Sequence, residues 1–335
     1  MLYVFSRFKE CQNRFEKEKR SLWWKGVFFV DWIIAFFIHG ASINDYFAYR
    51  FFYLRRSGRK EFITFRRHKK IQAICNPTLT DRELCRDKAC FNRHFSAYLG
   101  RNWLDVSTCT FQEFCNFFLN YEVVFLKDIS SFRGIGIKKL QSSDVNVEKL
   151  YQQLQTKKEA NYILEEPIIE NDELASFHPW SINTIRIVTV YNEKTDKVYL
   201  MNARIRMGNN KNNVDNFHFQ GIGANIDIQS GVINSLGYDM FDNTYICHPL
   251  TGKQIVGFQI PCWEECKLFV EKAARMIPTV RYIGWDVVIG VNGNFSLIEA
   301  NDNADHDFQQ LYNKGLWKEY RKVLSKIPVS YTHLR

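Results

Sequence analysis

Two short β-patterned runs on either side of Asn292-Gly293 constrain the fold more than any other feature of the sequence. The runs, residues 282–289 and 295–300, are rich in β-branched and aromatic residues, and Asn-Gly is a favoured pair in two-residue type I′ turns. If these two residues form the loop, Asp286 lies directly opposite Glu299, with Cβ atoms about 4.5 to 5.5 Å apart. The pattern therefore predicts an antiparallel hairpin in this part of the chain.

The predicted hairpin places three oxygen-bearing side chains on one face. Asn301 follows Glu299 by two residues, so it shares the face of that carboxylate. Two carboxylates placed opposite each other repel, unless a hard cation between them turns the repulsion into coordination. Asp286, Glu299 and Asn301 therefore predict a magnesium site. The alternative is a solvent-facing strand pair with the carboxylates splayed apart.

The rest of the chain falls into a helical first part and a mixed second part. The first 120 residues show apolar helical periodicity with breaks near Gly40, Ser57-Gly58 and Asn76-Pro77. From about Tyr121 onward, short β-rich segments alternate with helical patterns. The further expected strands are 123–127, 162–164, 184–191, 198–206 and 254–260, and the expected helices are 147–155, 263–276 and 307–324. This order predicts an α+β body behind a helical N-terminal region.

The N-terminal region is basic and aromatic. Residues 1–80 hold 16 Lys or Arg and 6 Asp or Glu, so the net charge of +9 on the chain is concentrated there. Together with Trp23, Trp24 and Trp32, this charge could mark a docking face for anionic lipid or an acidic polymer, although charge runs are usually solvated surfaces. The alternative is a helical subdomain with an aromatic core and a solvated basic surface. No nucleic-acid partner is expected, because no motif of that kind is recognised.

Several features favour a cytoplasmic protein, either free or peripheral at the inner membrane face. Residues 1–20 are too charged for a secretory signal. The apolar stretch 27–38 is interrupted by Asp31 and falls short of the ~20 apolar residues of a membrane span, so we expect a buried helix there. Nine cysteines, without a CxxC pair, favour reduced thiols over a disulfide framework.

A possible phosphate-binding segment follows the expected strand 123–127. Lys127 ends the strand, and the next residues include Ser130, Ser131, Gly134 and Gly136. An ammonium group and several backbone N–H groups in such a loop can surround polyphosphate oxygens. The spacing is not that of a P-loop, and the glycines also fit a simple turn.

Two further clusters carry polar groups suited to ligand binding. Glu165 and Glu166 end an apolar run that could present a carboxylate and backbone groups to an adenine amine. Arg204 and Arg206 alternate on an expected strand and so share a face, where they could clamp a carboxylate or a phosphoryl group. A solvated edge strand explains the arginines almost as well. No GxSxG, Cys/His nucleophile or HExxH pattern is present, so hydrolase functions lack support.

Taken in order, these elements resemble the ATP-grasp superfamily, and within it the sugar-transfer-associated ATP-grasp family of bacterial polysaccharide biosynthesis. The resemblance extends over most of the chain. It is carried by 40–46 (GASINDY), Asp87-Lys88, Leu99-Gly-Arg101, Lys127 with Gly134 and Gly136, Glu165-Glu166, 181–189 (SINTIRIVT), Val214-Asp-Asn216, His248-Pro249, Gly284-Trp-Asp286 and Ile298-Glu-Ala-Asn301.

The resemblance implies an ATP-grasp fold, in which two α+β subdomains grip ATP, preceded by a helical N-terminal region. It places a helical region at 1–85 and a catalytic region at 86–328, with a tail at 329–335. Within the catalytic region, 86–170 would include the glycine-loop lid, and 171–328 would carry the metal and substrate sites. The implied cofactors are ATP and Mg²⁺.

The resemblance also assigns a role to each candidate residue. For the nucleotide it implies Lys88 and Lys127 on the phosphates, Ser130, Ser131, Gly134 and Gly136 in a closing loop, Glu165 at the adenine amine, and main-chain contacts from Glu166 and Ile168. For the metal it implies Asp286, Glu299 and Asn301. For the acyl-phosphate and its tetrahedral successor it implies Arg186, Arg204 and Arg206, and we add Asn183 to this catalytic set.

The implied activity is a Mg-ATP-dependent carboxylate-amine ligase that works through an acyl-phosphate in capsule or exopolysaccharide assembly. Its substrates would be a small carboxylate and an amine, one of them sugar-linked, such as a uronic acid and an amino acid. Two alternatives remain open: an ATP-dependent phosphotransferase on the same fold, and a non-catalytic assembly protein that binds polysaccharide or membrane through residues 1–80.

Overall fold

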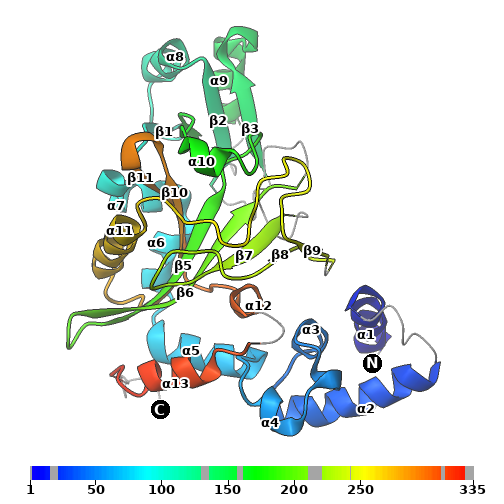
Figure 1. Ribbon diagram of the computed structural model, residues 1–335. Helices are drawn as coiled ribbons and strands as arrows, with labels where there is room; N and C mark the ends of the chain where they lie inside the picture. Colours follow the sequence, from blue (N-terminus) through cyan, green and yellow to red (C-terminus); the bar gives the residue numbers. More distant parts are fainter. Residues whose placement is uncertain are drawn as a thin grey trace.

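The computed structural model describes residues 2–15, 22–129, 136–156, 161–209, 221–241, 243–310 and 314–328. Helices and short 3-10 turns make up the chain as far as Tyr98, as expected for a helical N-terminal region (Figure 1). These elements are α1 (Leu2–Phe15), α2 (Leu22–His39), α3 (Ile43–Ala48), η1 (Phe51–Tyr53), α4 (Arg56–Arg59), α5 (Phe65–Cys75), η2 (Thr80–Arg82), α6 (Glu83–Arg86), α7 (Lys88–His94) and η3 (Ser96–Tyr98).

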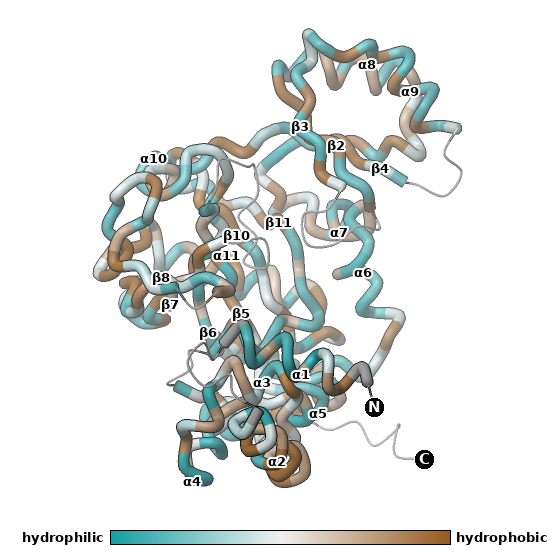
Figure 2. The backbone as a smooth tube through the Cα atoms, turned by 90° about the vertical axis from the view of Figure 1, so that its right-hand side faces the viewer, coloured by the Kyte–Doolittle hydropathy of each residue, from teal (hydrophilic) through white to brown (hydrophobic). Residues whose placement is uncertain are grey.

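A small antiparallel sheet follows the helical region. Its strands lie in the order β1-β4-β2-β3. They are β1 (Trp103–Asp105), β2 (Val123–Asp128), β3 (Ile137–Gln141) and β4 (Tyr162–Glu165). Two amphipathic helices, α8 (Phe111–Asn120) and α9 (Val147–Thr156), bury Phe114, Phe117 and Leu154 against the sheet. This subdomain projects from the body of the molecule (Figure 2).

The larger sheet forms the body of the protein. Its strands lie in the order β11-β10-β5-β6-β7-β8-β9, and neighbouring strands are antiparallel. They are β5 (Thr184–Asn192), β6 (Lys197–Met207), β7 (Ile222–Ile226), β8 (Gly237–Tyr238), β9 (Thr244–Tyr245), β10 (Tyr282–Ile289) and β11 (Phe295–Asn301). Every residue of β5 and β10 is buried, because helices cover both faces. On one face lies α11 (Trp263–Arg275), and on the other α5 packs with α13 (Trp317–Leu324).

Most of the expected strands are confirmed, but one expected strand and one expected helix are wrong, and β1 lies within the first 120 residues, which were expected to be helical. Residues 254–260 form only isolated bridges at Gln254 and Gln259, because this segment turns through Gly257 (φ 85°). The helix expected at 307–324 is divided into α12 (His306–Gln309) and α13. Gly315 lies so close to the backbone of Glu61 that any side chain would clash there, and the chain is extended at that point.

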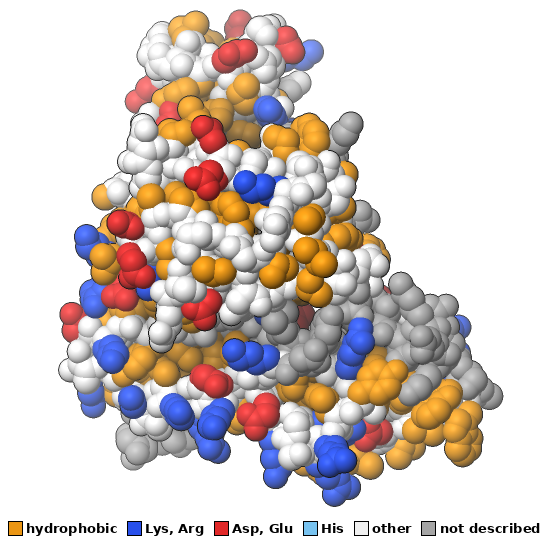
Figure 3. All heavy atoms as spheres, viewed as in Figure 1, with side chains coloured by type: hydrophobic (Ala, Val, Ile, Leu, Met, Phe, Trp, Pro, Cys, Tyr) orange, Lys and Arg blue, Asp and Glu red, His pale blue; other side chains and the backbone are white. Residues whose placement is uncertain are grey.

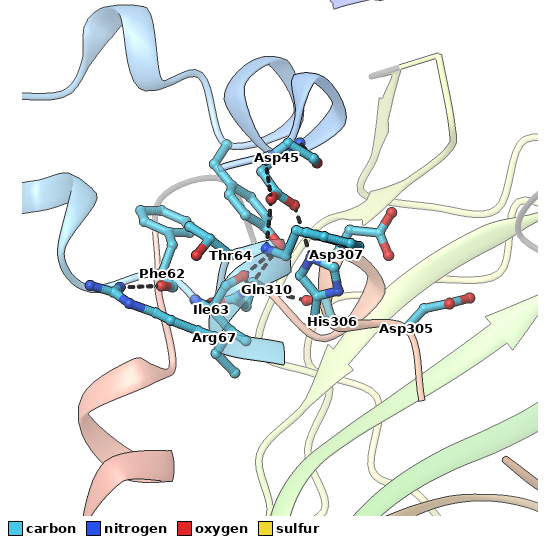
Figure 4. Close-up of polar contacts among 12 residues, drawn as sticks. Asp45, Phe62, Ile63, Thr64, Arg67, Asp305, His306, Asp307 and Gln310 are labelled. Carbon is cyan, nitrogen blue, oxygen red and sulfur yellow. Dashed lines mark hydrogen bonds and ion pairs between the residues drawn. The ribbon is translucent and has the colours of Figure 1, made fainter. Parts of the chain in front are cut away.

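The N-terminal helices hold the segment that follows β11. His306 Nε2 lies 2.8 Å from Asp45 Oδ1, and Gln310 Oε1 accepts the N–H of Ile63 at 2.7 Å (Figure 4). Gln310 also donates to the Tyr49 hydroxyl at 2.8 Å. The helical region is therefore joined to the chain directly after the hairpin by buried polar contacts.

Helix α2 corrects another expectation, because it is not a buried helix. Its side chains Phe28 and Ala35 enter an aromatic core shared with α1 and α3. Its opposite side is open, with Trp23 76% and Phe37 69% exposed. The apolar composition of α2 predicted that the helix is buried on all sides, but the short neighbouring helices cover only one side of it. Among the described helices, none has both the length and the apolar content to cross a membrane.

All nine cysteines are free thiols. Burial raises the pKa of both Cys75 and Cys266 to about 12, so these two thiols are held in the neutral form and act as core residues.

Candidate active site

A row of charged residues crosses the large sheet from its β11 edge. In the register of the strands, Asp286 faces Glu299 on one side and Arg186 on the other, and Arg186 in turn faces Arg204 on β6. The predicted Asp286–Glu299 pair is therefore confirmed, and the adjacent strand adds an arginine that the hairpin argument alone did not place.

The hairpin that forms this pair differs from the expected one in its connection and in its register near the turn. Asn292 and Gly293 both have positive φ (59° and 73°), as a type I′ turn requires. The connection nevertheless spans residues 290–294, and near the turn Val287 pairs with Leu297. Ile298 is then an extra residue on β11, forming a bulge that brings Glu299 opposite Asp286. The expected two-residue loop is wrong, whereas the pair that it predicted is right.

Asp286 has no exposed surface and is ion-paired twice. Its Oδ2 accepts hydrogen bonds from Arg206 Nη2 at 2.6 Å and Arg186 Nη2 at 2.8 Å, and Arg186 Nε donates to Oδ1. Burial opposes ionisation, but these two guanidinium groups hold the pKa of Asp286 well below its usual range. Arginine therefore supplies much of the positive charge that the sequence argument assigned to a metal ion.

Glu299 is the accessible member of the carboxylate pair, with 45% of its side chain exposed. Arg186 Nη2 lies 3.5 Å from its Oε1, and the Asn301 amide donates to the same oxygen at 3.0 Å. The burial of the rest of its side chain and the charge of Asp286 raise the pKa of Glu299. Its carboxylate and the amide oxygen of Asn301 are ligands that suit Mg²⁺.

The donor set is small. Among the described residues, no group of three or more His, Cys, Asp and Glu side chains is placed to hold a metal. Two carboxylates with one amide oxygen fit a magnesium ion that keeps its other positions for water and substrate phosphates, as Mg²⁺ commonly does. The residues present therefore fit this ion.

Arg204 differs from the other two arginines because it forms no ion pair with a carboxylate among the described residues. The side chain is 1% exposed, and its Nε and Nη1 have no hydrogen-bond acceptor in the described structure. Its guanidinium lies 5.3 Å from the ring centre of Tyr238 and 5.4 Å from that of Phe308. Burial lowers the pKa of Arg204 to about 9. A buried cation without an acceptor is unfavourable, so this position is suited to receive an anion.

A second charged cluster surrounds Glu165 at the end of β4. Glu165 is buried and accepts hydrogen bonds from Arg101 Nε and Nη2 (2.8 and 2.9 Å), from Lys127 Nζ (2.6 Å) and from Asn92 Nδ2 (3.0 Å). Burial opposes its ionisation, but Arg101 and Lys127 hold its pKa well below the usual range. Lys127 and Glu165, predicted separately for phosphate and adenine, are thus an ion pair.

Arg101 links this cluster to the metal-site hairpin. Its Nη1 donates to the carbonyl of Leu297 on β11 at 2.7 Å while its other donors hold Glu165 on β4. Gly100 has φ +60°, and a Cβ there would lie 2.5 Å from Ser296 Oγ, so only glycine allows this approach. Leu99-Gly-Arg101 is one of the segments that carry the family resemblance, but no role was predicted for it. The glycine followed by an arginine is the signal in the sequence that points to this contact.

Lys88 lies between the two clusters. Its Nζ donates to the carbonyls of Asp128 (2.8 Å) and Ile129 (3.2 Å) at the end of β2. Burial lowers its pKa, while the charge of Glu299, on the other sheet, acts to raise it. The two lysines therefore lie near each other at the end of β2, where Lys88 is bound to main-chain carbonyls and Lys127 to Glu165.

Other predicted residues are placed apart from these clusters or lie outside the described residues. Asn183 donates from its backbone and side chain to Glu170 and does not join the arginines. Glu166 accepts the N–H of Asn102 at 2.8 Å, and Ile168 lies in the segment after β4. Gly136 (φ 80°) precedes β3. Of the residues named in the sequence analysis, those that lie outside the described ranges are Ser130, Ser131, Gly134 and the segment Val214-Asp-Asn216.

Comparisons with known proteins agree with the resemblance seen in the sequence. A family model described as "Sugar-transfer associated ATP-grasp" matches residues 132–325, more than half of the chain. No curated protein matches the sequence. Among solved structures, the ATP-grasp ligase PsnB complexed with a minimal precursor aligns at 14% identity and a TM-score of 0.45, covering 74% of this chain and 62% of that chain.

Two other solved structures are similarly distant. D-alanyl-alanine synthetase A from Vibrio cholerae aligns at 11% identity and a TM-score of 0.44, covering 73% of this chain and 65% of that one. The D-alanine-D-alanine ligase from Coxiella burnetii aligns at 8% identity and a TM-score of 0.39, covering 74% and 63%. The chain thus spans a little over three fifths of the length of these proteins.

Proposed function

The chain belongs to the sugar-transfer-associated ATP-grasp family, and we propose that its ATP-grasp fold serves a Mg-ATP-dependent ligase that joins a carboxylate to an amine through an acyl-phosphate. The observation that carries this proposal is the accessible Glu299 carboxylate, beside the buried Asp286 and within the electrostatic reach of Lys88. Oxygen ligands with an ammonium group in their neighbourhood suit a magnesium-bound polyphosphate.

In this proposal each cluster has a separate task. Lys88 and Lys127 bind the phosphates of ATP and neutralise their charge, and Glu165 keeps Lys127 in place. Glu299, Asn301 and, through its remaining lone pairs, Asp286 would hold the metal. When bound, Mg²⁺ would supply charge neutralisation on the β- and γ-phosphates. Solved PsnB structures that contain Mg and ADP are consistent with these cofactors.

The arginine row would serve the acceptor side of the reaction. A substrate carboxylate oxygen attacks the γ-phosphorus, the bond to the β-phosphate oxygen breaks, and ADP leaves. The amine nitrogen then attacks the acyl carbon, and phosphate leaves as the nitrogen loses a proton. Arg186 and Arg206 would stabilise the charge that develops beside Asp286. Arg204, with two donors lacking acceptors, would bind a carboxylate or phosphate of the substrate.

The substrate class rests on the family. Its description points to sugar transfer, so we propose a sugar-linked carboxylate or amine, such as a uronic acid joined to an amino acid during capsule or exopolysaccharide assembly. A cytoplasmic location follows from the need for ATP and agrees with the free thiols.

A hydroxylamine trap tests the reaction type. The protein is incubated with Mg-ATP, hydroxylamine and a panel of uronic acids and amino acids, and hydroxamate and ADP are measured. An acyl-phosphate gives hydroxamate and free phosphate in equal amounts, so hydroxamate formation supports the ligase. ADP formed together with a stable phosphorylated sugar and no hydroxamate would instead identify a phosphotransferase.

A further inference from the structure

The outward side of α2 is an apolar stripe. Its large side chains Trp23, Val27, Val30, Ile34 and Phe37 are exposed by 76%, 39%, 58%, 39% and 69%. They are spaced by three or four residues, which places them on one side of the helix over a length of about 21 Å. This outward face, which we call the α2 stripe, is as hydrophobic as the side that enters the core.

The acidic residue of α2 is turned away from the stripe. Asp31 lies on the inner side, where both of its oxygens are held by Arg59 at 2.7 and 2.9 Å and the Tyr46 hydroxyl donates to it at 2.8 Å. The same inner side buries Phe28 and Ala35. The partly buried Asp31–Arg59 ion pair and the core contacts of Phe28 and Ala35 therefore fix which side of α2 faces outward.

A basic side chain lies at one end of the stripe, and others are numerous in the segment that follows α2. Residues 40–70 contain nine Lys or Arg and only two Asp or Glu. Arg66 donates to the last carbonyls of α2, those of Phe36 and Phe37, at 3.2 Å each, which places its charge at the end of the stripe. Further basic residues of this segment are exposed: Arg55, Arg56, Lys60, Lys69 and Lys70. Figure 3 shows hydrophobic side chains at the lower right edge of the molecule, with Lys and Arg beside them along the lower edge.

We propose that the α2 stripe docks on the surface of a membrane that contains anionic lipids. A helix with one apolar face and a basic border lies in the plane of the interface and buries its apolar side chains about 5–10 Å deep. Basic residues near the surface each add attraction to anionic headgroups. An acidic polymer would leave the apolar stripe in water, and a second copy of the chain would oppose two borders of like charge. The lipid surface is the occupant that matches both properties.

Docking would fix the catalytic sheet relative to the bilayer. The helical region is joined to the segment after β11 by the Asp45–His306 and Gln310–Ile63 contacts. The stripe and the carboxylate pair therefore belong to connected parts of the same body. This proposal does not depend on the ligase function, because the surface is separate from the site of Asp286 and Glu299.

Vesicle flotation of the full chain tests the proposal. Vesicles of phosphatidylcholine alone are compared with vesicles in which about one third of the lipid is phosphatidylglycerol. We expect the protein to float with the anionic vesicles, and the V30Q/F37Q variant to bind them about tenfold more weakly or worse. A matched control, L119Q/L268Q, removes exposed leucines from α8 and α11 (81% and 55% exposed) and should bind like the native protein.

Three results would overturn the proposal. The first is native protein that does not float with anionic vesicles. The second is V30Q/F37Q that floats as well as the native protein while its circular dichroism is unchanged. The third is a native dimer in sedimentation that V30Q/F37Q converts to a monomer, with no lipid binding by either, because the stripe would then be an interface between two copies. Mg-ATP binding, measured on the same samples, should be unaffected by V30Q/F37Q.

Discussion

Asp286 and Glu299 are cross-strand partners, yet their carboxylates are in opposite surroundings. Asp286 has no exposed surface and is bound by Arg186 and Arg206, whereas Glu299 keeps 45% of its side chain exposed. The two positions should therefore respond differently to the same kind of substitution. Loss of charge at Asp286 removes the partner of two arginines, and loss of charge at Glu299 removes an accessible ligand.

Asp286→Asn should destabilise the protein strongly. It leaves the buried Arg186 without a full counter-charge, and breaking a buried ion pair in this way costs about 3–5 kcal/mol. Chemical denaturation with urea measures the loss in the free energy of unfolding. Glu299→Gln, at the exposed partner, should change that free energy by less than about 1 kcal/mol. Equal losses in the free energy of unfolding for both variants would contradict the different surroundings of Asp286 and Glu299.

Arg204→Met should leave stability unchanged or raise it. The native guanidinium is buried with two donors that find no acceptor in the part of the chain that the structure describes, and a methionine of similar length removes that unfavourable charge. The same change at Arg186, which is paired with Asp286, should lower the midpoint of thermal unfolding by several degrees. A large loss of stability in Arg204→Met would show that the guanidinium has a structural partner and is not reserved for a substrate anion.

Glu165→Gln should disrupt the contact between the two sheets. The variant leaves Arg101 and Lys127 without their shared carboxylate, so we expect a loss of about 3–5 kcal/mol in the free energy of unfolding. The neighbouring Glu166, which contacts Asn102 at the surface, provides the control, and Glu166→Gln should cost less than about 1 kcal/mol. Similar stability of the two variants would contradict a linking role for Glu165.

His306→Gln should destabilise the protein more at pH 6 than at pH 9. Burial opposes protonation of His306, but the hydrogen bond and charge of Asp45 raise its pKa above the usual 6.5. A histidine whose pKa is higher in the folded than in the unfolded protein stabilises the fold at pH values below the pKa of the unfolded state. This stabilisation is lost as the pH rises through the pKa of the folded state. The neighbouring His68, whose pKa is lowered to about 3, stays neutral over this range.

Urea denaturation at the two pH values measures this difference, which we expect to be about 1–2 kcal/mol. His94→Gln on α7, whose ring contacts the carbonyl of Met276, serves as a control for the loss of a histidine without a carboxylate partner. If His306→Gln cost the same at both pH values, the charged Asp45–His306 pair would be excluded as a source of stability.

Much of the hairpin could be predicted from local pattern, because alternation and the Asn-Gly turn are properties of neighbouring residues. The bulge at Ile298 could not, since its sequence has no distinct turn signal. The longer connection, residues 290–294, and the bulge at Ile298 shift the strand register in opposite directions. The Asp286–Glu299 pair was therefore predicted correctly from a wrong loop. The arginine partners required the order of strands, which places Arg186 beside Asp286 and Arg206 within reach of it.

The errors elsewhere have related causes. The composition of α2 indicates an apolar helix but does not reveal which sides its neighbours cover, so burial was predicted for a helix with an open face. Residues 254–260 have the composition of a strand, but the turn through Gly257 limits them to isolated bridges. β3 was not predicted because it carries two lysines and is largely exposed at the edge of the small sheet.

Calorimetry of Mg-ATP binding tests the central claim most directly. The native protein should bind ATP in the presence of Mg²⁺ and much more weakly in its absence. Glu299→Gln should lose most of this magnesium dependence while remaining folded, and Glu319→Gln, an exposed carboxylate on α13, should behave like the native protein. If the native protein does not bind Mg-ATP, or if Glu299→Gln binds it as the native protein does, the proposed ligase site is contradicted.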